Sequence, residues 1–236
     1  MQSDNNQTGA TEPGEGVSRR RIIGGVGVAV AGGLAAGLAG APPASARTPG
    51  GGTPATGRPG DTVFEFVCQI GQNGADFTGL GYLTAIAGLD RDTLFTGAPR
   101  DETHARYLLT ADGQLVARSV DGAVHSLNIE GQLGIHYSQS GGANWANPAS
   151  FAVGGPIATY DLELQDVLTV ILPATGIPTL NGVATQNGKA RVNGRPFGRP
   201  NMTTRLTATG IGTRSDTGPI ENAMATLTVA GSMIAT

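Results

Sequence analysis

Four residues between positions 107 and 136 carry side chains that could together bind a ligand and transfer a proton: Tyr107, Arg118, His125 and His136. A neutral imidazole can accept a proton near neutral pH, and a tyrosine hydroxyl can donate a hydrogen bond to a carbonyl or alkoxide oxygen. An arginine beside a histidine lowers the imidazole pKa through repulsion between like charges. We therefore expect these four residues to form a catalytic or ligand-binding set.

The glycines around these residues suggest how they are positioned. Asp-Gly or Glu-Gly pairs occupy positions 112–113, 121–122 and 130–131, nine residues apart. Asp-Gly is typical of two-residue hairpin turns, because glycine accepts a positive φ. Three such turns predict four short antiparallel strands between residues 105 and 138.

The register of this predicted meander would align the four side chains in one row across the sheet. Tyr107 would lie opposite Arg118, Arg118 opposite His125, and His125 opposite His136. Apolar residues flank the row on the same face, which is typical of a pocket floor: Leu109, Val116 and Leu127. A solvated row of unrelated polar side chains is the alternative. The two histidines could also share a metal ion, but no third ligand follows at a recognisable spacing.

The chain from Thr62 onwards predicts an all-β domain. Short runs rich in Val, Ile, Leu, Thr and Tyr alternate with Gly, Pro, Asn and Asp, and no long window has helical periodicity. We expect a single antiparallel β-barrel of about eight strands with up-and-down connections; a β-sandwich is the alternative. The opposite face of the predicted meander mixes polar and apolar residues. Another part of the chain could cover this face, or it could bind a second copy, so a homo-oligomer is one expected state.

The N-terminal segment has the order of an export signal. The sequence SRRRII at 18–23 resembles the twin-arginine signal, and a glycine-rich apolar stretch follows it, with Ala-Ser-Ala at 44–46. We expect 1–46 to be a signal peptide, handled by the twin-arginine translocase and removed by a signal peptidase. An uncleaved anchor is the alternative. The protein is therefore predicted to be secreted, with a flexible linker at 47–61 and the β-barrel domain at 62–236.

The charged residues and the cysteine content of the chain exclude some classes of partner and of covalent cross-link. The chain has a formal net charge of −3, and Lys189 is its only lysine, so it lacks the basic surface expected of a nucleic-acid-binding protein. Cys68 is the only cysteine, which excludes an intramolecular disulfide and suits a protein that folds before export. Cys68 lies in an apolar run and is predicted to be a core residue rather than a nucleophile.

The glycine-rich hairpin pattern and the late run TRLTATGIGTR at 204–214 resemble the small barrels of the allene oxide cyclase and dirigent group. The resemblance implies an eight-stranded barrel whose apolar cavity binds a small hydrophobic molecule. It further implies that the protein guides cyclisation or radical coupling without a cofactor. A lipocalin-type barrel fits the same strand pattern.

Three classes of function follow from these patterns. The first is a cofactor-free cyclase or isomerase, and the second is a non-catalytic carrier of apolar ligands. The third is a surface or matrix protein that binds glycans or its own copies. An internal cavity would favour the first two classes. A glycan-binding protein would display Trp145 and Tyr137 on the outside, and a structural protein would have a filled barrel.

Overall fold

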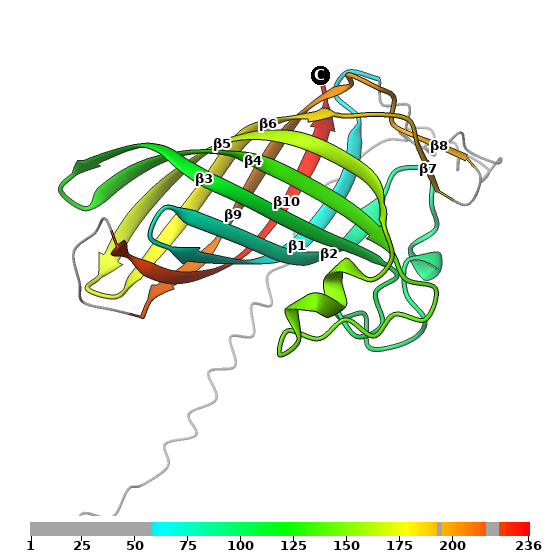
Figure 1. The fold of residues 1–236 in the computed structure, drawn as a ribbon, viewed down its shortest axis with the longest axis horizontal. Coiled ribbons are helices and arrows are strands. Elements are labelled where there is room, and N and C mark those ends of the chain that lie inside the picture. Colours follow the sequence, from blue (N-terminus) through cyan, green and yellow to red (C-terminus); the bar gives the residue numbers. More distant parts are fainter. Residues whose placement is uncertain (1–57, 193–194, 216–221) are drawn as a thin grey trace, which may run out of the picture. The chain divides into compact units, whose positions relative to one another are not determined.

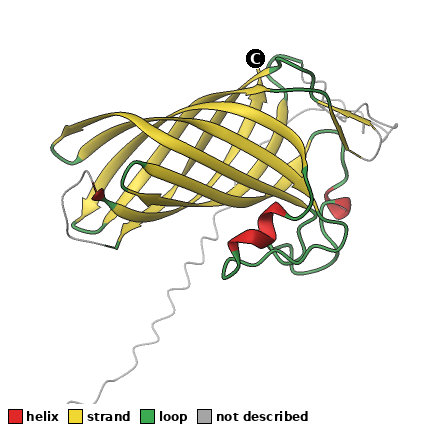
Figure 2. Ribbon diagram, in the orientation of Figure 1, coloured by secondary structure: helices red, strands yellow, loops and turns green. Residues whose placement is uncertain are grey.

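Eight long antiparallel strands close into one barrel in the computed structural model, which describes residues 58–192, 195–215 and 222–236 (Figure 1). The predicted signal peptide at 1–46 lies outside the described residues, as does the linker up to residue 57. The named helical elements within the described residues are two short 3-10 turns, η1 (Arg91–Thr93) and η2 (Pro148–Ala152) (Figure 2). Within the described ranges, no helix has the length and apolar character needed to cross a membrane.

The barrel strands are 11 to 17 residues long. They are β1 (Thr62–Asn73), β2 (Asp76–Ile86), β3 (Tyr107–Asp121), β4 (Val124–Tyr137), β5 (Pro156–Leu172), β6 (Thr175–Gln186), β9 (Thr203–Arg214) and β10 (Met224–Ala235).

The connections are up-and-down, because each barrel strand pairs with the next one along the chain and β10 pairs with β1 to close the barrel. A separate two-stranded hairpin, β7 (Ala190–Val192) with β8 (Arg195–Phe197), is inserted between β6 and β9. The prediction of a single antiparallel barrel of about eight strands is confirmed.

The closed sheet divides each strand into an inner and an outer face. On β5, Leu162 and Leu164 line the interior, whereas Asp161 and Glu163 are exposed. This alternation follows from the two-residue period of a strand. An aromatic group fills part of the core, where Phe197 of β8 stacks on Phe64 with ring centroids 6.4 Å apart and Phe64 packs edge-on against Tyr160.

The predicted four-stranded meander is wrong. Residues 107–137 form one long hairpin, β3–β4, which turns once, next to Gly122. Gly122 has a φ of +57°, the left-handed conformation that the turn requires and that glycine adopts at little cost. The pairs at 112–113 and 130–131 lie within the strands, where Gly113 is directly opposite Gly131.

The equal spacing of the three glycines reflects this pairing. Gly113 and Gly131 are each nine residues from Gly122. The hairpin tip pairs Asp121 with Val124, and the extra residue Val116 on β3 then shifts the register by one, which brings the two glycines face to face. A Cβ at Gly131 would overlap the carbonyl oxygen of Asp112 and lie 2.7 Å from the Cα of Gly113. The glycines therefore permit a close backbone approach inside the sheet, a role that the sequence pattern does not distinguish from a turn.

We predict that Gly131→Ala lowers the free energy of unfolding by about 1–3 kcal/mol, the usual range for an overpacked interior position. The new methyl group has no space unless β3 and β4 move apart. Urea-induced unfolding measures the change. Gly155→Ala is the matched control, since a Cβ there meets no atom within 4 Å. Equal stabilities of the two variants would contradict the close approach of the two strands.

Candidate functional site

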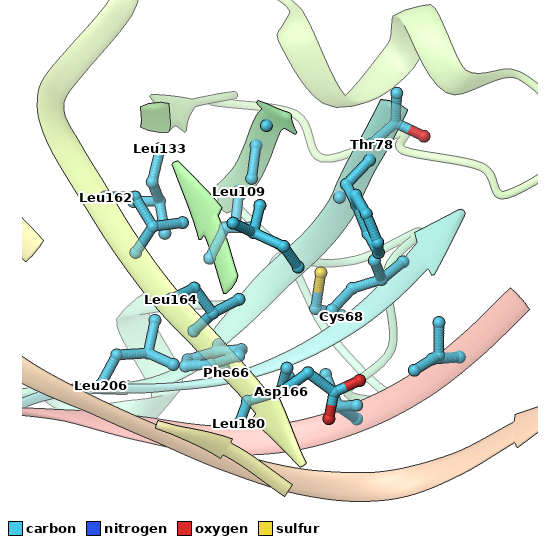
Figure 3. Close-up of a pocket in the computed structure, with 18 residues that line it drawn as sticks. Phe66, Cys68, Thr78, Leu109, Leu133, Leu162, Leu164, Asp166, Leu180 and Leu206 are labelled. Carbon is cyan, nitrogen blue, oxygen red and sulfur yellow. The ribbon is translucent and has the colours of Figure 1, made fainter. Parts of the chain in front are cut away.

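An apolar cavity of about 60 Å³ lies inside the barrel (Figure 3). Side chains from all eight strands surround it, and most of them are leucine, phenylalanine or other apolar residues. Members of this lining include Phe66, Ile70, Phe77, Leu109, Ile129, Leu133, Leu162, Leu164, Leu180, Leu206, Leu227 and Val229. Cys68 also lines the cavity, and burial raises the pKa of its thiol to about 12, which keeps the thiol protonated as expected for a core cysteine.

Asp166 is the only charged residue among the described side chains that line this cavity. It is 2 % exposed, and its Oδ1 accepts a hydrogen bond from the backbone N–H of Thr179 at 3.2 Å. Figure 3 shows its carboxyl group beside Phe66 and Leu180. Burial raises the pKa of this carboxyl from 3.8 to about 6, although the Thr179 hydrogen bond opposes the shift. Desolvation therefore dominates, because a carboxylate is poorly stabilised among apolar groups.

A second pocket, the mouth pocket, has a volume of about 190 Å³ and adjoins the inner cavity. The two share Phe77, Asp166 and Leu227 as lining residues. Hairpin ends and basic side chains contribute to its wall: Arg118, Gly122, Ala123, His125, Val170, Pro173, Ala174 and Arg214. Asp166 consequently lies where the apolar interior meets the more polar mouth.

A β-bulge directs Arg118 into the mouth. The β3–β4 register shifts between Leu115 and Ala117, so Val116 is an extra residue on β3. Side chains alternate along a strand, and one extra residue exchanges the two faces beyond it. Arg118 therefore pairs with Leu127, which also lines the mouth pocket. Without the bulge, Arg118 would point to the outside of the barrel.

His125 lies diagonally across from Arg118 on the same face, because its direct partner on β3 is Val120. Partial burial lowers the pKa of His125, and the positive charges of Arg118 and Arg214 lower it further. Arg118 therefore lowers the pKa of His125 as expected, although burial lowers it more. A lowered pKa keeps the imidazole of His125 neutral near neutral pH.

Tyr107 and His136 lie away from this mouth. Tyr107 is buried at the start of β3, where its ring packs against Tyr137 with centroids 5.1 Å apart. Eleven residues separate it from Arg118, which corresponds to roughly 35 Å of strand. His136 pairs with Leu108 and lies on the outer face, because its chain neighbour Ile135 pairs with the cavity-lining Leu109.

His136 is nevertheless only 6 % exposed. Its Nε2 is 3.0 Å from the hydroxyl of Thr110, and its Nδ1 is 3.4 Å from the carbonyl oxygen of Gly154. Burial lowers its pKa, partly offset by the Gly154 contact. These contacts link the outer wall of the barrel to the β4–β5 connection, which suggests a structural role for His136.

The predicted row of Tyr107, Arg118, His125 and His136 is therefore corrected. The structure brings Arg118 and His125 together, and places Tyr107 near the opposite end of β3 and His136 on the other face. His125 and His136 lie near opposite ends of the same strand, β4, and on opposite faces of it, so they cannot share a metal ion or a proton. In the described part of the chain, no three His, Cys, Asp or Glu side chains form a group that could hold a metal ion.

Sequence reasoning missed Asp166 and Arg214. A signal for Asp166 exists in the run from Tyr160 to Val170, where every second residue is apolar except Asp166. A carboxylate inside such a stripe marks a charged group on the buried face of a strand. The position of Arg214 at the mouth follows from the pairing of β9 with β10 and has no comparable local signal.

The arrangement can support acid chemistry on an apolar molecule. A carboxyl with a pKa of about 6 is protonated in about one molecule in ten at neutral pH and in more at lower pH, and its protonated form can donate a proton to a bound ligand. The surrounding leucine and phenylalanine side chains would hold the ligand and limit the access of water. At the mouth, Arg118 and Arg214 provide positive charge, and the neutral imidazole of His125 provides a further hydrogen-bonding group.

A comparison with protein-family models, with curated protein sequences and with solved structures finds no match to this chain.

We predict that Asp166 makes stability depend on pH. Its carboxyl binds a proton more tightly in the folded chain, with a pKa of about 6, than at the ordinary value of 3.8. The resulting stabilisation is complete below the ordinary value and is lost as the pH rises through about 6. The shift of about two units corresponds to about 3 kcal/mol. Relative to Asp166→Asn, the wild-type protein should lose about this amount between about pH 4 and about pH 8.

Urea-induced unfolding of both proteins across this range measures the difference. Asp161→Asn, on the exposed face of the same strand, reports the general effect of removing a carboxylate from β5. A constant difference between the wild-type protein and Asp166→Asn would contradict a raised pKa of Asp166.

We also predict that Arg118→Gln raises the pKa of His125, because it removes one of the two positive charges that lower it. Titration of the imidazole signals by NMR measures this pKa directly. Arg205→Gln is the control, since Arg205 is exposed near the other end of β9. An unchanged His125 pKa in Arg118→Gln would show that the two side chains do not interact in the mouth.

Proposed function

We propose that the barrel binds a slender apolar molecule and that Asp166 acts as a general acid in its isomerisation or cyclisation. The observation that carries the proposal is a buried carboxyl, with its pKa raised to about 6, in the wall of an otherwise apolar cavity. Burying such a group without a cationic partner destabilises the fold. A polar group that is costly to bury in a cavity is a common feature of functional sites.

The proposed chemistry needs no cofactor. The protonated carboxyl of Asp166 donates its proton to an oxygen or a double bond of the ligand, and this generates an electron-deficient carbon. Loss of a proton from a neighbouring carbon to the Asp166 carboxylate restores the acid, so the net reaction is an isomerisation. The apolar wall would keep water from adding to the intermediate.

The cavity dimensions favour a narrow ligand. An engineered cavity of about 150 Å³ in another protein holds benzene, and the inner cavity here is smaller, at about 60 Å³. The mouth pocket, at about 190 Å³, has room for a single ring. A ligand with an aliphatic chain directed inward and a ring or polar group in the mouth fits both volumes.

The barrel with an apolar cavity agrees with what a resemblance to the allene oxide cyclase and dirigent group implies, and that resemblance supports the cyclase or isomerase over other enzyme classes. A carrier would use the same cavity without turnover, so it is the alternative. A glycan-binding role has less support, because Tyr137 packs against Tyr107 and Trp145 packs against Phe151. We further propose that the twin-arginine segment exports the protein to the cell exterior.

Ligand binding and turnover can be tested separately with neutral probes. 4-Butylphenol, which has one ring and one aliphatic chain, should bind the wild-type protein with one-to-one stoichiometry in a calorimetric titration. Ala111→Phe should weaken binding at least about tenfold, because Ala111 lines the inner cavity and the added ring fills it. Ala117→Phe is the matched control on the exposed face of β3 and should bind like the wild-type protein.

The acid-labile one-ring epoxide 1-methylcyclohexene oxide tests turnover. The wild-type protein should accelerate its isomerisation to an allylic alcohol, as measured by gas chromatography, and Asp166→Asn should lose this activity while still binding 4-butylphenol. Asp161→Asn should retain both properties. Displacement of 4-butylphenol by the epoxide without conversion would favour a carrier, and absence of 4-butylphenol binding would refute the apolar ligand site.

A further inference from the structure

Exposed apolar side chains gather at the end of the barrel that contains the mouth pocket. Most of the exposed large apolar residues in the described part of the chain lie on the hairpin tips or the adjoining strand ends there. We call this set the apolar rim: Val120, Val124, Ile171, Leu172, Ile177, Ile211 and Met224. Contiguous exposed apolar surface is rare on monomeric soluble proteins and marks an interaction site.

The rim is continuous across two adjacent hairpins. Val124 at the β3–β4 tip pairs with Thr169 of β5, and the Val170 N–H donates to the carbonyl oxygen of Ala123 at 2.7 Å. The β5–β6 tip therefore lies beside the β3–β4 tip, and its Ile171 and Leu172 are 51 % and 61 % exposed. Both hairpins extend beyond the shorter β1–β2 hairpin at the same end (Figure 1).

The rim also borders the entrance to the cavity. Ala123 and Pro173, at the two tips, line the mouth pocket, and so does Gly176 beside Ile177. Arg118 and Arg214 line the same pocket behind the tips. At the two tips themselves, within residues 120–124 and 171–174 of the described chain, Asp121 is the only charged side chain.

We propose that the apolar rim docks the barrel mouth onto a lipid bilayer that contains anionic headgroups. Aliphatic side chains on projecting tips can enter the boundary between headgroups and acyl chains, and arginines behind them can contact phosphate groups. The arginines of the mouth complement anionic headgroups in charge, whereas a second copy docked mouth to mouth would bring like charges together. This surface is independent of the reaction proposed for Asp166.

Site-specific fluorescence tests which part of the full chain enters the bilayer. Trp145 is the only tryptophan, so Leu172→Trp in a Trp145→Phe background places a single reporter on the rim. Val183→Trp in the same background is the matched control, because Val183 is an exposed apolar residue of β6 outside the rim. Brominated lipids quench tryptophan only where it contacts acyl chains, so an apolar leader that also bound the vesicles would not mimic the result.

With brominated phosphatidylcholine vesicles that also contain phosphatidylglycerol, quenching at position 172 should exceed quenching at position 183 by at least about threefold. Adding Arg118→Gln and Arg214→Gln should reduce the preference for phosphatidylglycerol over phosphatidylcholine alone. Equal quenching at the two positions, or none at position 172, would overturn the proposal.

Analytical sedimentation of the same proteins without vesicles tests whether a second copy of the chain, rather than a bilayer, covers the apolar rim. A dimer that dissociates when Ile171 and Leu172 are both changed to serine, together with no quenching at position 172, would overturn lipid docking and assign the rim to a second copy. The vesicle experiment contains no cavity ligand, so its failure would not bear on the cavity or on Asp166. Failure of 4-butylphenol to bind would likewise not bear on the apolar rim.

Discussion

Closure of the sheet is the constraint on which the rest of the structure depends. Once β10 pairs with β1, each strand has an inner and an outer face, and the two-residue period decides which side chains enter the interior. On β5 this rule places Asp166 inside along with its apolar neighbours. On β3 the extra residue Val116 exchanges the faces and turns Arg118 inward. The site therefore arises from register rather than from a local motif.

Inside the barrel, the acidic side chain of Asp166 lies deeper than the basic side chains of the mouth pocket. Asp166 lies at the junction of the two cavities, and the hydrogen bond from Thr179 gives its carboxyl only partial compensation for burial. The basic groups Arg118, His125 and Arg214 line the wider mouth. No ion pair joins Asp166 to a cationic side chain among the described residues. A carboxyl in this position keeps its proton to a higher pH than an ordinary aspartate, and the protonated form is the state that an acid catalyst needs.

The all-β barrel could be predicted because its signals are local. Strand-forming residues, Gly and Pro punctuation and the absence of helical periodicity all occur within short windows. The register could not be predicted in the same way. Gly113 and Gly131 look like turn residues, yet they face each other inside a hairpin. The Val116 bulge has no distinct sequence pattern, so the inward direction of Arg118 is apparent only once the strands are paired.

The candidate site was predicted in part for the same reason. Arg118 and His125 do lie together, but as diagonal neighbours rather than opposite ones. His136 appeared to belong with them because the predicted turn at 130–131 placed it on their face. Asp166 was overlooked although its apolar neighbours at every second position marked it. A polar residue inside an apolar alternating stripe was thus a better guide to the site than the spacing of the glycines.

The most direct test of this account is the pKa of the Asp166 carboxyl in the folded protein. Carbon-13 NMR of labelled protein can follow the carboxyl signal across a pH titration, with Asp166→Asn used to assign it. The account predicts a midpoint of about 6. A midpoint at the ordinary aspartate value of 3.8 would mean that Asp166 is solvated or paired, and would contradict an acid held in an apolar cavity.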